Sequence, residues 1–272
     1  MIDTHAHIHD RAFDTDRDSV LDRAKSVGVS GIITIGTSIE ESQRAISLAN
    51  QYPGYVFAGV AVHPHEYSKL PDLYTRTLWK NILRELLENP CVVAIGECGL
   101  DFHDFGSGVS EEQKQTQKEG FLDHVQLAID TQKPLVIHCR EAYEDVLEIL
   151  GKYHTKLSSI ILHCYQGDEE VTKKFLDMDE VYISFAGNVT YPIKKILEGT
   201  KNDMREIARA VPLERLLVET DCPYLSPQAF RGKRNEPGYV ASTLGFLAEL
   251  YNVSKKELGQ KTEQTSRRIF SL

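Results

Sequence analysis

Six side chains of the types that bind divalent metal ions are spread through this 272-residue sequence. Neutral imidazole and carboxylate groups are the usual protein ligands of Zn²⁺, Mn²⁺ and related ions. The first two residues form a His-x-His pair, and alternate residues of an extended strand point to the same side, so both imidazoles could bind one ion. The six candidate metal ligands are His5, His7, Glu97, His138, His163 and Asp221.

Each of these residues also has an ordinary structural explanation. A single histidine at the end of a strand is more often a hydrogen-bonded polar group than a metal ligand, and a His-x-His pair can occur in any histidine-rich N-terminus. Asp221 could cap the loop that follows it, and Glu97 could be a loop carboxylate. The prediction of a metal centre therefore depends on where the fold places the six residues relative to one another.

The sequence alternates between short apolar runs and segments of helical composition. Nearly continuous hydrophobicity within short runs is typical of strands that are buried on both faces of a parallel sheet. Strand and helix in repeated alternation predict an α/β fold, a (β/α)8 TIM barrel of the metal-dependent hydrolase type, rather than a sandwich. We expect a single TIM-barrel metallohydrolase domain over residues 1–272. The predicted strands cover residues 1–4, 31–35, 55–62, 91–95, 134–137, 159–162, 181–185 and 215–218, and the predicted helices include 17–27, 39–52, 75–88, 111–131, 141–153, 239–251 and 254–270.

The candidate metal ligands fall at the ends of the predicted strands. One or two of them end or closely follow the first, fourth, fifth, sixth and eighth strands. In a barrel of this kind the carboxyl ends of all strands meet at one rim, which carries the active site. Because five separate strand ends carry a possible ligand at the same relative position, chance is a poor explanation for the set, and we expect the six side chains to face one small volume.

Two metal ions explain this set better than one. A single catalytic zinc usually accepts about three protein ligands. We expect two divalent ions (Zn²⁺, Mg²⁺ or Mn²⁺), and such a pair can activate a water molecule and stabilise charge on phosphoryl oxygens. Asp221 would accept the proton of that water. Together with Glu97, the carboxylate shared by the two ions, it is a predicted catalytic residue. In the predicted arrangement one ion is held by His5, His7 and Asp221, the other by His138 and His163, and Glu97 is shared.

The net charge of −9 opposes the long-range approach of nucleic acid, so positive groups would have to act locally. His63 and His65 follow the third predicted strand and Arg140 follows the fifth. Lys233 and Arg234 lie after the eighth strand, where phosphate sites often form in barrels. These five residues are the predicted substrate contacts. Their alternatives are a structural turn for the two histidines, a salt bridge to the following helix for Arg140, and a solvated surface turn for the last two.

Two further carboxylates are candidates for an outer layer around the ligands. Asp101 could orient a ligand imidazole, as carboxylates around metal sites do, or it could cap a loop. Glu219 is a candidate ion-pair partner for Arg140 or Lys233.

The five cysteines lack C-x-x-C spacing and three of them lie in apolar runs, which indicates reduced thiols in a cytosolic protein. The N-terminus does not resemble a secretion signal, and no apolar run approaches the roughly 18 residues that a membrane span requires. We therefore expect a cytoplasmic protein without a membrane segment. No obligate protein partner is evident.

Seven motifs, in order along essentially the whole chain, resemble those of the TatD family of metal-dependent deoxyribonucleases. This resemblance implies a TIM barrel, divalent-metal dependence and 3′–5′ exonuclease or related DNase activity, with single-stranded DNA or 3′ ends as the substrate. It also implies the six metal ligands named above. The motifs are IDTHAH (2–7), GVAVHPH (59–65), GECGLDF (96–102), VIHCR (136–140), HCYQG (163–167), ETDCPYL (219–225) and RGKRNEP (231–237).

The sequence departs from the pattern of the family at three places that do not include a candidate ligand. Tyr165 and Gln166 replace the usual aromatic-serine pair after the sixth strand, His124 replaces a glutamine, and Thr265 replaces an asparagine. The first of these departures could alter how substrate is held at the rim.

Two other classes of function remain open. A related centre could polarise a carbonyl group, as in an amidohydrolase that cleaves an amide or ester bond of, for example, an aminoacyl-tRNA or a cyclic substrate. A carboxylated lysine at the fourth strand would favour that class, but Glu97 occupies this position. The second alternative is a binding or scaffold protein whose barrel has lost activity, and retention of all six ligand types argues against it.

Overall fold

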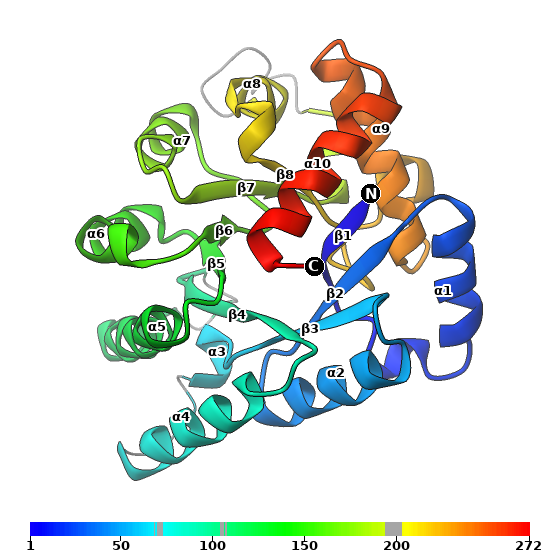
Figure 1. Ribbon diagram of the computed structural model, residues 1–272. Helices are drawn as coiled ribbons and strands as arrows, with labels where there is room; N and C mark the ends of the chain where they lie inside the picture. Colours follow the sequence, from blue (N-terminus) through cyan, green and yellow to red (C-terminus); the bar gives the residue numbers. More distant parts are fainter. Residues whose placement is uncertain (68, 70–72, 104–105, 107, 194–202) are drawn as a thin grey trace.

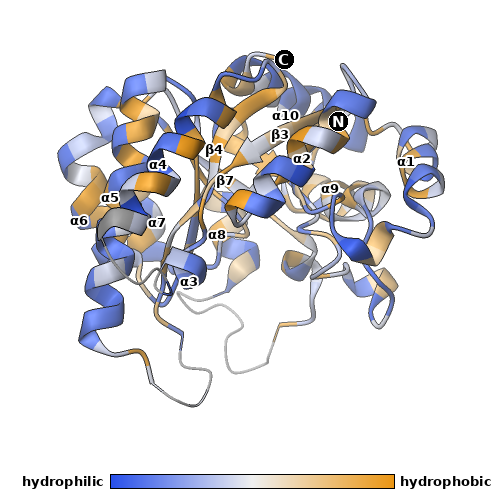
Figure 2. Cartoon of the chain, turned by 90° about the horizontal axis from the view of Figure 1, so that it is seen from below, coloured by the Kyte–Doolittle hydropathy of each residue, from blue (hydrophilic) through white to orange (hydrophobic). Residues whose placement is uncertain are grey.

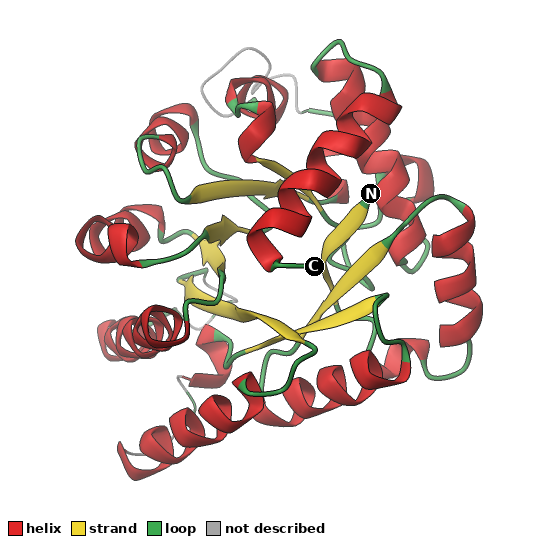
Figure 3. Ribbon diagram, viewed as in Figure 1, coloured by secondary structure: helices red, strands yellow, loops and turns green. Residues whose placement is uncertain are grey.

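The computed structural model describes residues 1–67, 69, 73–103, 106, 108–193 and 203–272. Eight parallel strands lie in the order in which they occur along the chain, and the first also contacts the last, so the sheet forms a barrel. Helices surround this barrel (Figures 1 and 3). The (β/α)8 fold predicted from the sequence is confirmed. The strands are β1 (Ile2–Ala6), β2 (Gly31–Ile35), β3 (Val56–Val60), β4 (Val92–Asp101), β5 (Leu135–Arg140), β6 (Ile160–Leu162), β7 (Val181–Phe185) and β8 (Leu216–Val218).

Several helices begin at side chains that satisfy their free backbone N–H groups. The hydroxyl of Ser38 accepts from the N–H of Glu41, and Ser110 and Gln113 form a reciprocal capping box. No helix among the described residues is long and apolar enough to cross a membrane. The helices are α1 (Arg17–Ser26), α2 (Ile39–Gln51), α3 (Pro64–Tyr67), α4 (Leu73–Leu87), α5 (Glu111–Thr131), α6 (Tyr143–Tyr153), α7 (Glu169–Leu176), α8 (Met204–Ala210), α9 (Val240–Leu250) and α10 (Lys255–Phe270).

Apolar residues fill both faces of the sheet, which explains why the strands are almost continuously hydrophobic (Figure 2). The larger of two apolar clusters joins residues of the strands to residues of the surrounding helices. A smaller cluster, which includes Ile33, Val136 and Leu217, fills the barrel and also contains Ile269 and Phe270 at the end of α10. Helix α10 therefore covers the N-terminal end of the barrel, and the C-terminus lies over the centre of the ring of strands (Figure 1).

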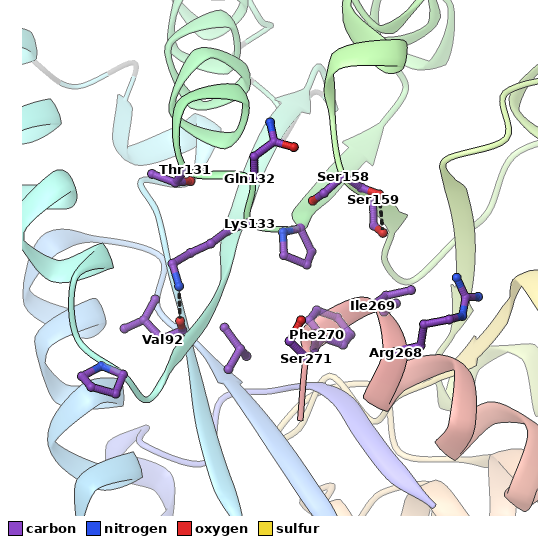
Figure 4. Close-up of a pocket in the computed structure, with 13 residues that line it drawn as sticks. Val92, Thr131, Gln132, Lys133, Ser158, Ser159, Arg268, Ile269, Phe270 and Ser271 are labelled. Carbon is purple, nitrogen blue, oxygen red and sulfur yellow. Dashed lines mark hydrogen bonds between the residues drawn. The ribbon is translucent and has the colours of Figure 1, made fainter.

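A cavity of about 520 Å³ lies at this N-terminal end, between the starts of β4, β5 and β6 and the end of α10 (Figure 4). Its polar side chains bond to the chain itself: Lys133 donates to the carbonyl oxygen of Val92 (2.7 Å), and Arg268 donates to the hydroxyl of Tyr182 (3.0 Å). No histidine or carboxylate side chain is among the described residues that line it. The described residues that line this cavity thus include none of the candidate metal ligands.

Strand β4 differs most from its predicted range. It continues from the expected end at residue 95 to Asp101, so Glu97 lies within the strand instead of after it. The register between β4 and β5 shifts between Ile95 and Cys98. Such irregularities change the direction in which a strand side chain points. The helices α7 and α8 and the short α3 had no counterpart among the predicted ranges.

Gly99 allows β4 to approach β5 closely. Its φ is +134°, and a Cβ atom built there would lie 2.1 Å from the carbonyl oxygen of His138. A side chain at residue 99 would therefore push apart the two strands that bring Glu97 and His138 together.

We expect Gly99→Ala to lower the stability of the protein more than Gly54→Ala does. Gly54 also has a positive φ (+76°), but no atom lies within 4 Å of its Cβ position, so that variant measures backbone strain alone, about 1–2 kcal/mol. The added clash at residue 99 should cost about 1–3 kcal/mol more. Thermal and urea unfolding of both variants would measure the difference. Equal losses would show that the close approach of β4 and β5 does not depend on Gly99.

Candidate metal centre

The carboxylate of Glu97 lies at the centre of a cluster of imidazoles at the C-terminal rim of the barrel. Its Oε2 atom is 2.7 Å from His163 Nε2, 3.5 Å from His138 Nδ1 and 3.8 Å from His5 Nε2. The residue is only 5% exposed. A carboxylate buried to this degree requires positive charge or hydrogen-bond donors around it, and three strands supply the groups that can provide them.

Asp221 adjoins the same cluster from the loop after β8. Its Oδ1 atom is 3.3 Å from His7 Nε2 and 3.7 Å from His5 Nε2. The rings of His5 and His163 stack with their centroids 3.9 Å apart. The structure thus brings together all six residues that the sequence marked as metal ligands, although β1 and β8 lie at opposite ends of the chain.

The donor atoms of this cluster fit a divalent cation. His5 Nδ1 and His5 Nε2 are buried and make no hydrogen bond, and unsatisfied buried polar atoms are rare in folded proteins. Imidazole nitrogen and carboxylate oxygen atoms lie close enough together to bind a common ion. Three sets of ligand atoms each lie within 4.8 Å of one another: His5, His7 and Glu97; His5, His163 and Asp221; and His63, Glu97 and His138.

These sets differ in two respects from the partition predicted from the sequence. His163 groups with His5 and Asp221, although its Nε2 atom is also 3.3 Å from His138 Nδ1. His63, predicted to contact substrate, has a ring nitrogen in the set with Glu97 and His138. Glu97 belongs to sets on both sides of the cluster, which is the position that a shared ligand requires.

The electrostatics of the cluster keep Glu97 ionised. Burial raises the pKa of Glu97, but the imidazoles of His163, His138 and His5 outweigh burial and hold that pKa well below its usual value. Burial lowers the pKa of His163, and Glu97 together with Glu219 raises it well above the ordinary value. Metal ligands must be deprotonated, so a divalent cation would replace the proton that otherwise balances the charge of Glu97.

Groups behind the cluster fix the orientation of its imidazoles. His7 Nδ1 donates to the carbonyl oxygen of Ile35 (2.7 Å), which leaves Nε2 facing Glu97 and Asp221. Asp101 Oδ2 lies 3.2 Å from His138 Nε2 and 2.9 Å from His65 Nε2. Pairs of this kind select the ring tautomer and its orientation in metal sites.

Glu219 also belongs to this outer layer and is fully buried. It accepts a hydrogen bond from the backbone N–H of Cys164 (2.6 Å), and its Oε1 atom lies 3.3 Å from His163 Nδ1. The sequence suggested Arg140 or Lys233 as its partner, whereas the structure places its carboxylate beside His163.

Two cavities adjoin the cluster. The larger, of about 530 Å³, is lined by residues that include His7, His63, Glu97, His138 and Asp221, together with Arg140. The smaller, of about 240 Å³, shares His7, His63 and Glu97 with it and adds the carboxylates of Asp10, Glu41 and Glu66. The cluster therefore lies where an open cavity meets a smaller acidic one.

Two of the predicted substrate contacts lie away from both cavities. Arg234 forms an ion pair with Asp16 (2.7 Å), donates to the carbonyl oxygen of Ala12 and covers the ring of Phe13. Lys233 is exposed and lies over the ring of Phe230. Neither residue is among the described residues that line the two cavities, so their role as substrate contacts stays a prediction.

The sequence interpretation missed part of the wall of the larger cavity. Asn188, Tyr191, Met204 and Leu225 line it. They follow β7 and β8 at the same rim as the metal ligands, so their place after predicted strands could have marked them. Asn188, Tyr191 and Met204 lie outside the seven motifs, and Leu225 ends the motif ETDCPYL without a group that marks it for chemistry.

Comparisons with known proteins fit this geometry. A family model described as TatD related DNase matches residues 2–271. The chain belongs to the TatD family. The resemblance inferred from the motifs is thereby confirmed, and with it the class of enzyme: a metal-dependent hydrolase of a nuclease family.

Similar TatD relatives and structures cover the whole chain. A Bacillus subtilis protein named as an uncharacterized metal-dependent hydrolase, YabD, is 35% identical over all of this chain and 99% of its own. The 3′-5′ ssDNA/RNA exonuclease TatD of Erwinia tasmaniensis is also 35% identical, with full coverage of both chains. The crystal structure of the TatD homologue YjjV from Escherichia coli superposes with a TM-score of 0.86 at 26% identity, covering 100% of this chain and 98% of that one.

We expect Asp101→Asn to weaken metal binding by about 10–100-fold. The amide would present either its oxygen or its nitrogen to His138, so it would no longer impose one tautomer on the ring. Asp123→Asn is the matched control, since Asp123 bonds to Tyr67 and Lys80 away from the cluster. Titration of the metal-free variants with Mn²⁺ would measure the affinity. Wild-type affinity in Asp101→Asn would contradict a positioning role for Asp101.

Proposed function

We propose that the protein is a 3′–5′ exonuclease that hydrolyses phosphodiester bonds in single-stranded DNA or RNA with two divalent metal ions. The observation that carries this proposal is the buried Glu97 carboxylate, which shares sets of possible ligand atoms with His5 and His7 on one side and with His63 and His138 on the other. Relatives named as 3′-5′ ssDNA/RNA exonucleases support the substrate and the polarity.

Divalent ions, when bound, would activate a water molecule and stabilise negative charge on the phosphoryl oxygens. Asp221 would accept the proton of that water. Its side chain is 14% exposed, against 7% for Glu97, and it lines the larger cavity, so it can meet both the cluster and substrate. Glu97, which is more deeply buried, would act as the shared ligand.

The charges around the two cavities favour one location for the nucleic acid. Arg140 lines the larger cavity, and no other lysine or arginine does so among the described residues. Asp10, Glu41 and Glu66 line the smaller cavity and would repel a phosphodiester backbone. We therefore place the strand in the larger cavity, with its scissile phosphate at Glu97 and Asp221.

The proposal is tested with DNA and RNA oligonucleotides labelled at the 5′ end, in the presence of Mg²⁺, Mn²⁺ or Zn²⁺. A 3′–5′ exonuclease would produce a ladder of labelled fragments that shorten one nucleotide at a time. Glu97→Gln should lower this activity by at least about 100-fold, because a neutral amide cannot replace a shared carboxylate. Glu88→Gln, an exposed site in the loop after α4, serves as the control.

Full metal-dependent cleavage by Glu97→Gln would contradict the role of Glu97 as the shared ligand. Hydrolysis of amide or ester substrates, with no cleavage of DNA or RNA by the wild type, would reject the nuclease in favour of the amidohydrolase-type alternative.

Arg140 and Lys233 should differ in their effect on the salt dependence of binding. The slope of log K against log[salt] is negative, and loss of one phosphate contact decreases its magnitude by about 0.7 for a single strand. We expect Arg140→Ala to show this decrease and Lys233→Ala to keep the wild-type slope, because only Arg140 lines the cavity. Binding of a single-stranded oligonucleotide in Ca²⁺, measured by fluorescence anisotropy at several salt concentrations, would distinguish the two. A decrease in Lys233→Ala would place the strand elsewhere.

A further inference from the structure

The described side chains that line the larger cavity fall into two chemically different groups. One group consists of the metal-ligand cluster and Arg140. The other, called the uncharged end below, has no charged side chain among the described residues and consists of amide, aromatic and aliphatic groups that follow β6, β7 and β8. This uncharged end is lined by Gln166, Asn188, Val189, Tyr191, Met204 and Leu225.

Close packing holds the wall at this end in place. Gly187, at the start of the 3-10 turn Gly187–Thr190, approaches the next loop so closely that a Cβ atom would lie 2.2 Å from the carbonyl oxygen of Leu225. The hydroxyl of Tyr191 donates to the carbonyl oxygen of Ser226 (3.0 Å). The guanidinium of Arg231 lies 4.2 Å from the centre of the Tyr191 ring. The loops after β7 and β8 thus form one connected surface.

Two side-chain amides meet at this end of the cavity. Asn188 Nδ2 lies 3.7 Å from Cys164 Sγ, and Gln166 Nε2 lies 4.0 Å from the same sulfur. A thiol sulfur is a weak hydrogen-bond acceptor. Both amide groups are therefore positioned by Cys164, next to the metal ligand His163, but a stronger acceptor on a ligand could take over their N–H groups at small cost.

We propose that the uncharged end of the cavity binds the nucleobase of the 3′-terminal nucleotide while the scissile phosphate lies at the cluster. This proposal rests on the exonuclease function proposed above. The charged phosphate matches the metal-ligand cluster and Arg140. The flat, partly apolar base matches the uncharged end. Gln166 and Asn188 contact the edge of the base, and the aromatic and aliphatic side chains contact its face.

The subsite should require a base without strongly selecting among the four bases. An amide both donates and accepts hydrogen bonds, and every base offers both kinds of partner and an aromatic face. We therefore expect the enzyme to discriminate against a 3′-terminal residue that lacks its base.

The experiment compares two 5′-labelled DNA oligonucleotides that differ only at the 3′-terminal residue, which is either a normal nucleotide or a tetrahydrofuran abasic analogue. We expect the wild type to remove the normal nucleotide with a kcat/KM at least about tenfold higher. Gln166→Ala and Asn188→Ala should bring this ratio close to one. Gln115→Ala, on the exposed face of α5, is the matched control and should keep the wild-type ratio.

Equal rates on the two oligonucleotides in the wild type would overturn the base subsite and leave the exonuclease proposal intact. An unchanged ratio in both amide variants would overturn the assignment of Gln166 and Asn188. Failure of the wild type to cleave any nucleic acid would instead reject the exonuclease function, and the base subsite with it.

A second measurement does not depend on turnover. In it, dAMP and deoxyribose 5-phosphate compete with a labelled single-stranded oligonucleotide for binding to the protein in Ca²⁺. The wild type should bind dAMP more tightly, and the amide variants should lose that advantage. Equal affinities in the wild type would also overturn the proposal.

Discussion

The structure depends on one buried carboxylate. Glu97 lies at the rim of the barrel with almost no contact with solvent, and its charge is tolerated only because imidazoles from three other strands or their ends surround it. Burying such a group without compensation would cost several kcal/mol. A divalent cation shared among these ligands is the compensation that the donor atoms fit best, and the metal-dependent family to which the chain belongs is consistent with it.

The barrel meets this requirement because the ends of three strands, β2, β4 and β8, orient ligands that other strands carry. The carbonyl oxygen of Ile35 on β2 fixes His7, and Asp101 on β4 fixes His138 on β5. Glu219, which follows β8, faces His163. The groups that orient the imidazoles are thus distributed around the rim. The irregular register of β4 beside Gly99 therefore matters for the site as well as for the fold. The opposite end of the barrel contains no comparable groups among the residues that line its cavity (Figure 4).

The sequence was most informative where local periodicity controls the structure. Continuous apolar runs mark buried strands, and the residues at their ends must converge, so the grouping of His5, Glu97 and His163 could be predicted. Pairings that depend on the paths of loops could not. Arg234 pairs with Asp16, far away in the sequence, and a ring nitrogen of His63 lies close to Glu97 and His138. The irregularity that places Glu97 inside β4 likewise has no signal in hydrophobicity alone.

Anomalous X-ray scattering from crystals grown with Mn²⁺ would show whether Glu97 is a ligand shared by two ions. We expect two anomalous peaks about 3.5–4 Å apart, both within coordination distance of the Glu97 carboxylate. A single peak, or two peaks of which only one contacts Glu97, would contradict the shared role of Glu97.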